Sequence, residues 1–145
     1  MTGRAPADGG LRPLFRAHLP GWQLTAVETG ATSPGTPDME YCAPGGAQGW
    51  IENKMTRGWT VSFRPLQPGW ISRRARLGGR VLVAVRRLSG PADELWLVDG
   101  GHVLTLQERG LRGTPVLGRW AGGPVGWDWG EVGRMLAGGT ERNAL

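Results

Sequence analysis

An unbroken apolar run, Val81–Val85, sets the tightest limit on the fold of this chain. Five consecutive apolar residues, most of them β-branched, between arginines predict a strand buried on both faces of its sheet. The chain has 145 residues, and 39% of them are hydrophobic. That length fits one domain, with a core large enough for one sheet flanked by helices.

The rest of the chain alternates between strand and helix patterns. A turn-rich segment, residues 43–48, predicts a hairpin between two of the strands. We expect an α/β fold with a mixed β-sheet flanked by helices. Residues 1–10 are expected to be a disordered lead, residues 11–109 the core, and residues 110–145 a C-terminal loop and helix extension. The expected helices are Leu11–Leu19, Gln67–Leu77 and Trp127–Leu136. The expected strands are Trp22–Glu28, Thr36–Cys42, Gly49–Met55, Arg80–Arg87 and Glu94–Val98. The last of these is expected to pair with a further strand at His102–Leu106.

Charge and composition narrow the class of protein. The formal net charge of +5 and the isoelectric point of about 10.9 favour a polyanionic partner such as DNA. With Cys42 as the single cysteine, an internal disulfide and a cysteine zinc cluster are excluded, which fits a cytoplasmic protein. No run of about 18 apolar residues is present, so a membrane span is not expected, and the N-terminus does not have the pattern of a signal peptide.

Lys54 is the single lysine in a chain with 17 basic residues. Lysine is a compact point charge whose pKa shifts on burial, whereas arginine is a wide fork that stays protonated. A site that must place one small cation or one proton donor beside a metal therefore cannot use arginine. The alternative is that a single lysine has been retained by chance.

The residues around Lys54 indicate a hydrolytic metal site. Side chains alternate along a strand, so Glu52 and Lys54 point to one side, and Asp38 can join them if its strand pairs with theirs. Two carboxylates at one place repel each other unless a cation such as Mg²⁺ joins them. Lysine beside that ion can orient or deprotonate an attacking water. The alternatives are that Asp38 caps a turn and that the other two residues form a solvated strand face.

The ordered motifs along residues 22–87 resemble the PD-(D/E)xK nuclease superfamily, and the fuller pattern is similar to its phage-type VRR-NUC and Holliday-junction-resolvase branch. The resemblance implies a restriction-endonuclease-like core and, for a phage gene, a location in the cytoplasm of the host cell. The matching elements are Glu28, Gly35–Asp38, Trp50–Lys54, Gln67 and Gly78–Val83.

The resemblance also implies roles for individual residues. Asp38 and Glu52 would bind Mg²⁺, for which Mn²⁺ would substitute, together with the backbone carbonyl of Asn53. The family often has a hydrophobic residue in the place of Asn53, so this polar side chain needs a partner. Lys54 would be the catalytic lysine.

Two further residues would act on the same site. Glu28 would bind a second ion or orient the attacking water, and Gln67 would point from its helix start toward the site. Pro68 and Gly69 continue that helix poorly, so its start is expected to be irregular. The alternatives are an exposed strand end for Glu28 and an ordinary first-turn position for Gln67.

Four arginines are candidates for phosphate contacts with DNA, and a solvated helix face is the alternative for the two that lie on an expected helix, Arg73 and Arg74. The function expected from these features is a metal-dependent DNA endonuclease, structure-selective in the manner of a junction resolvase. The alternatives are a non-catalytic DNA-binding module with the same fold and a small interaction protein. The sequence does not determine which shape of DNA is cut or whether the protein forms a homodimer. The four arginines that are candidates for phosphate contacts are Arg57, Arg64, Arg73 and Arg74.

Overall fold

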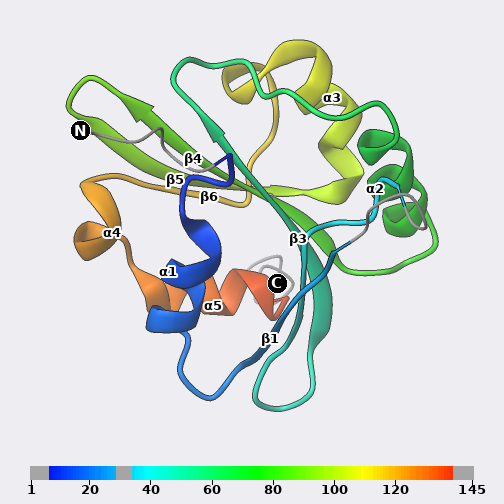
Figure 1. Ribbon diagram of the computed structural model, residues 1–145, viewed down its shortest axis with the longest axis vertical. Coiled ribbons are helices and arrows are strands. Elements are labelled where there is room, and N and C mark those ends of the chain that lie inside the picture. The colour runs from blue at the N-terminus through cyan, green and yellow to red at the C-terminus, as the bar shows by residue number, and fades with distance from the viewer. Residues whose placement is uncertain (1–6, 29–33, 139–145) are drawn as a thin grey trace.

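The computed structural model describes residues 7–28 and 34–138, and within them the chain is an α/β protein with a six-stranded mixed sheet and five helices (Figure 1). In these ranges, no helix combines the length and the apolar character needed to cross a membrane. The strands are β1 Gln23–Ala26, β2 Met39–Cys42, β3 Gln48–Thr56, β4 Val81–Ser89, β5 Ala92–Asp99 and β6 Gly118–Trp120. The helices are α1 Leu11–His18, α2 Gln67–Arg76, α3 Val103–Arg109, α4 Gly123–Gly126 and α5 Trp129–Leu136. Two 3₁₀ turns, η1 Gly100–His102 and η2 Leu111–Gly113, flank α3.

The strands follow one another across the sheet in chain order, β1 to β6. Each neighbouring pair is antiparallel except β3 and β4, which run parallel with Glu52 opposite Val83. Parallel neighbours need a crossover connection, and α2 lies in the segment that supplies it. The C-terminal half of β3 therefore lies next to β4 on one side and extends past β2 on the other.

The sheet has a hydrophobic cluster on each face, as the apolar run in β4 predicts. Leu82 and Ala84 belong to the cluster that contains residues of α1 and α5, whereas Val81, Val83 and Val85 belong to the cluster that contains residues of α2 and α3. All five side chains are at most 1% exposed. Burial on both faces is thus confirmed for this strand.

Several other expectations from the sequence are confirmed. The helices over residues 11–19 and 67–77 are α1 and α2 to within one residue, and the hairpin across residues 43–48 joins β2 to β3 in antiparallel pairing. Residues 1–6 of the expected disordered lead lie outside the described residues. Residues 8–10 form a turn, in which the carbonyl oxygen of Gly9 accepts a hydrogen bond of 2.8 Å from Arg86.

The strand expected at His102–Leu106 is wrong. Residues 100–102 form η1 and Val103 begins α3, while β5 pairs with β4 and β6 instead. The side chain of Asp99 accepts a hydrogen bond from the Gly101 backbone and so starts the turn. Val103 and Leu106 are three residues apart and fully buried, which is helical spacing and not strand alternation. The strand β6, within residues 110–126, was not predicted.

Gly49 gives a test of the packing between β2 and β3. A Cβ atom there would lie 2.5 Å from the hydroxyl oxygen of Tyr41, a fully buried side chain that donates a hydrogen bond to the Leu136 carbonyl oxygen. We expect Gly49→Ala to lower the free energy of unfolding by about 2 kcal/mol through overpacking. Chemical denaturation would measure this. Gly58→Ala is the control, because a Cβ at Gly58 meets nothing within 4 Å; equal effects of the two changes would contradict the prediction.

Candidate functional site

Asp38 lies where β2 and β3 stop pairing. The last paired residues are Met39 and Ile51, and Asp38 precedes Met39 in the chain. Its Oδ1 accepts a hydrogen bond of 2.9 Å from the Asn53 backbone N–H, and its two carboxylate oxygens each lie 3.3 Å from the Asn53 side-chain nitrogen. The carboxylate therefore satisfies a β3 amide that has no β2 backbone partner. The side-chain nitrogen of Asn53 thus has a polar partner, as its buried position requires.

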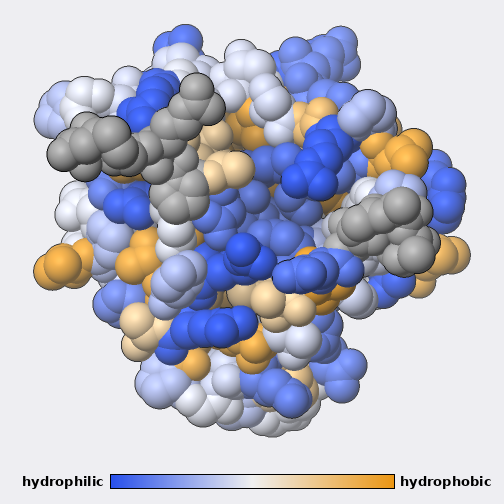
Figure 2. Space-filling view, viewed as in Figure 1, coloured by the Kyte–Doolittle hydropathy of each residue, from blue (hydrophilic) through white to orange (hydrophobic). Residues whose placement is uncertain are grey.

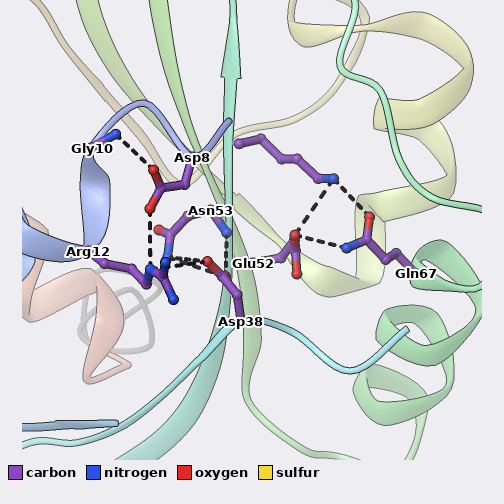
Figure 3. A network of polar contacts seen from close by, with 8 residues as sticks. Asp8, Gly10, Arg12, Asp38, Glu52, Asn53 and Gln67 are labelled. Atoms are coloured by element: carbon purple, nitrogen blue, oxygen red, sulfur yellow. Dashed lines mark hydrogen bonds and ion pairs between the residues drawn. The ribbon is translucent and has the colours of Figure 1, made fainter. Parts of the chain in front are cut away.

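Glu52, Lys54 and Gln67 form a second group of contacts beside Asp38 (Figure 3). Lys54 Nζ donates to Gln67 Oε1 at 2.8 Å, and Gln67 Nε2 donates to Glu52 Oε2 at 3.0 Å. Lys54 Nζ is also 3.6 Å from Glu52 Oε2. Gln67 Oε1 accepts a further bond from the Arg64 backbone N–H, so the first residue of α2 joins the loop before it to the lysine and the carboxylate on β3.

Among the residues that the structure describes, two buried oxygen atoms of this site have no hydrogen-bonding partner, Glu52 Oε1 and Asn53 Oδ1. A buried polar atom without a partner is costly, and such atoms in a folded protein often mark a bound ligand or ion. Carboxylate oxygens are the ligands that Mg²⁺ prefers. The free oxygen of Glu52, beside the Asp38 carboxylate, therefore fits a hard divalent cation.

The acidic residues alone do not form a complete ligand set. Among residues 7–28 and 34–138, no group of three or more histidine, cysteine, aspartate or glutamate side chains could hold a metal ion. Mg²⁺ is commonly bound through one or two carboxylates, with water and substrate phosphates completing its coordination. Asp38, Glu52 and the Asn53 carbonyl fit that kind of open site better than a closed structural one.

Burial dominates the ionisation of all three charged groups. It raises the pKa of Glu52 to about 7, with the Asp38 carboxylate adding to the rise and Lys54 opposing it. Burial likewise raises the pKa of Asp38, against the hydrogen bonds from Asn53 and the charge of Arg12. The pKa of Lys54 is lowered by burial, which outweighs its attraction to Glu52. Without a further cation, the site thus holds its carboxylates at a free-energy cost.

These residues line one cavity of about 470 Å³. In the space-filling view, hydrophilic side chains surround a hollow near the centre of the face that lies over β3 (Figure 2). The cavity can admit a charged group from solvent, since a quarter of the Asp38 side chain is exposed, at 26%. Its lining residues are Ala7, Asp8, Arg12, Val27, Glu28, Thr36, Asp38, Glu52, Asn53, Lys54, Arg64 and Gln67.

The remaining predicted residues divide between the cavity and the surface. Glu28 is exposed and lines the cavity just beyond β1, and Arg64 lines it before α2. Arg57 and Arg73 are exposed and are not part of the lining. The guanidinium of Arg74 lies over the ring of Trp70, with 4.5 Å between them, and contributes to a separate cavity. Contact of these arginines with DNA stays a prediction.

Asp8 and Arg12 were not predicted as site residues, although both line the cavity. Arg12 Nε lies 3.3 Å from Asp8 Oδ2 and 3.9 Å from Asp38 Oδ2. The spacing of four residues between Asp8 and Arg12 was a readable signal for an ion pair at the start of a helix. The approach of Arg12 to Asp38 had no such signal, because it depends on how α1 packs on the sheet.

Comparison of the chain with protein-family models, with curated proteins and with solved structures finds no match. A function for this protein is therefore inferred from the arrangement of its own side chains.

Gln67 is expected to contribute to stability through its three contacts. Gln67→Ala removes one hydrogen bond each from Glu52, Lys54 and the Arg64 amide, and we expect it to lower the free energy of unfolding by about 2 kcal/mol. Denaturant titration in EDTA would measure the loss. Gln107→Ala, at an exposed position of α3, is the matched control and should stay close to the unaltered protein. A Gln67→Ala protein as stable as this control would contradict the prediction.

Proposed function

We propose that this protein is a metal-dependent endonuclease that hydrolyses DNA phosphodiester bonds. The observation that carries the proposal is the meeting of Asp38, Glu52 and Lys54 in one polar cavity, with a buried Glu52 oxygen left without a partner. A binding-only protein has no need of two adjacent carboxylates whose ionisation is opposed by burial. A metal site that opens to a phosphodiester uses both.

The PD-(D/E)xK resemblance is supported by the elements on which its motifs fall. Asp38 leads into β2, Glu52 and Lys54 lie on β3, and Gln67 opens α2. Residues 78–79 precede β4, the apolar strand that runs parallel to β3. We infer on this basis that residues 11–109 form a restriction-endonuclease-like nuclease core.

Mg²⁺ or Mn²⁺ held by Asp38, Glu52 and the Asn53 carbonyl would neutralise phosphate charge and favour ionisation of the attacking water. The protein's own contribution begins with Gln67, which fixes Lys54 through a 2.8 Å hydrogen bond. Lys54, whose pKa is lowered by burial, is placed to orient that water or to stabilise the charge that develops on the phosphate oxygens.

Glu28 and the basic residues complete the proposed role of the cavity. Glu28 lines it from beyond β1, where its carboxylate can orient water or accept a second ion. Arg64 lines it from the loop before α2 and supplies positive charge for a DNA phosphate. Water attacks phosphorus, the bond to one ester oxygen breaks, and that oxygen leaves with a proton.

A cleavage assay with varied substrate shape tests the proposal. Labelled linear duplex, single strand and four-way junction would each be incubated with Mg²⁺, Mn²⁺ or EDTA. We expect metal-dependent cleavage that is lost in Asp38→Ala and Lys54→Ala, with the best substrate defining the shape preference. Metal-independent binding without cleavage of any substrate would overturn the proposal and favour the non-catalytic DNA-binding module.

A further inference from the structure

Arg12 reaches the candidate site from a firmly packed helix. Its neighbours Leu11 and Phe15 on α1 are fully buried in the core, so the backbone of Arg12 is fixed. The Arg12 side chain is 39% exposed and lines the same cavity as Asp38. The backbone of Arg12 is thus held in place while its guanidinium stays accessible to solvent. This combination is typical of a ligand-binding residue and not of an ion pair in the core.

The contact between Arg12 and Asp38 is loose, while that with Asp8 is closer. The Asp38 Oδ2 distance of 3.9 Å is too long for a hydrogen bond, whereas Nε donates to Asp8 Oδ2 at 3.3 Å. Asp8 is itself fixed, because its Oδ1 accepts from the Gly10 backbone N–H at 3.0 Å. Asp8 can therefore hold the guanidinium at the cavity when a divalent ion takes over the charge of Asp38.

The outer part of the guanidinium has donors to spare. Within the described residues, the one side-chain hydrogen bond of Arg12 and its looser contact with Asp38 both involve Nε, and neither terminal amino group has a hydrogen-bonding partner. Arginine donors form a planar fork that matches two oxygens of a phosphate. Lys54, by contrast, has a side chain only 14% exposed and offers a single charge that already contacts Gln67 and Glu52.

We propose that Arg12, oriented by Asp8, binds the non-bridging oxygens of a DNA phosphate in the cavity. The identity of the ligand as DNA rests on the proposed function. In Figure 3, Asp38 and Glu52 lie between Arg12 on one side and Gln67 on the other, and Gln67 accepts the hydrogen bond from Lys54. A phosphate beside the carboxylates would be bound from both sides, by the guanidinium of Arg12 on α1 and by the ammonium group of Lys54 on β3.

DNA affinity as a function of salt tests the proposal. The probes are a short labelled duplex and a short labelled single strand in Mg²⁺, with Lys54→Met present in all proteins so that the probes stay intact. We expect Arg12→Ala to weaken binding about 10-fold and to reduce the slope of log affinity against log salt by about 0.9 on duplex and about 0.7 on single strand. Arg12→Lys should restore the slope but only part of the affinity, because lysine lacks the fork.

Arg16→Ala is the matched control, since Arg16 is exposed one turn further along α1. The proposal is overturned if Arg12→Ala and Arg16→Ala give equal affinities and slopes. It is also overturned if Arg12→Ala changes only the Mg²⁺ concentration needed to stabilise the protein, because Arg12 would then be a simple counter-ion of Asp38.

The two proposals fail separately. A protein with Lys54 intact that cleaves DNA, together with an unchanged salt slope in Arg12→Ala, rejects the phosphate contact and keeps the nuclease. An intact protein that cleaves none of the substrates, together with a slope reduced by Arg12→Ala, rejects the nuclease and keeps the phosphate contact.

Discussion

Lys54→Met is expected to lower the rate of Mg²⁺-dependent DNA cleavage by about 1000-fold, the range typical for loss of one group that stabilises charge in a transition state. Methionine has a similar length and no charge, so the change removes the cation and its hydrogen bond to Gln67 while keeping most of the packing. Single-turnover cleavage of the preferred substrate would measure the chemical step without product release.

Two controls separate this effect from unfolding and from general loss of positive charge. The fold should survive Lys54→Met because Glu52, whose pKa burial already raises to about 7, can take up a proton when its cation is removed. Circular dichroism and thermal melting would check this. Arg109→Met, at an exposed position in the last turn of α3, removes the same charge outside the cavity and should leave the single-turnover rate within a few-fold. Similar rates for the two variants would contradict a catalytic role for Lys54.

Glu52→Gln is expected to make the metal-free protein more stable than the unaltered protein above pH 7. The folded-state pKa of Glu52 is raised from 4.5 to about 7, so the folded state binds the extra proton between these values. The stability associated with this group is fully present below pH 4.5 and is lost as the pH rises through 7. The loss amounts to about 3 kcal/mol by linkage.

Denaturant titrations from pH 4 to pH 8 in EDTA would reveal the difference. The unaltered protein should lose stability across the window, whereas Glu52→Gln should lose much less. Gln67 can still donate to the new amide oxygen, so the variant keeps that contact. Glu40→Gln, on the adjacent strand β2, is the control, and its free energy of unfolding should fall with pH as it does in the unaltered protein.

The Glu52→Gln variant also tests the proposed metal site. Mg²⁺ at about 100 times its dissociation constant should stabilise the unaltered protein by about 2.7 kcal/mol, because it binds the folded state alone. Glu52→Gln should lose most of that gain. Equal Mg²⁺ stabilisation of the two proteins would show that Glu52 is not a ligand.

Elements with local signals were predicted from the sequence. The apolar run in β4, the turn-rich hairpin and the helix beginning at Gln67 each carry their information within a few neighbouring residues. The strand expected at His102–Leu106 was wrong because a short apolar segment fits either spacing, and its burial on a helix face is decided by packing against α2 and β4. β6 was not predicted because it has only three residues and lies in a segment rich in glycine and proline.

The grouping of Asp38, Glu52, Lys54 and Gln67 was also predictable, since strand alternation and the hairpin register bring the first three together. The contact of Arg12 with Asp38 was not predictable. It depends on how α1 lies against β3, which no residue pattern within either segment specifies. The buried, unpartnered Glu52 oxygen is likewise a property of the packed structure and not of the motif.

Tyr41 of β2 donates its hydroxyl proton to the carbonyl oxygen of Leu136 in α5, 95 residues further along the chain. During synthesis on the ribosome, every residue of the proposed site is therefore made long before the helix that covers Met39, Tyr41 and Leu82. A chain cut short before α5 would carry all the proposed catalytic groups on a sheet with one apolar face covered only in part, by α1, a form expected to aggregate or be degraded. For a protein proposed to cut DNA, we expect this dependence on α5 to keep incomplete chains from acting as nucleases.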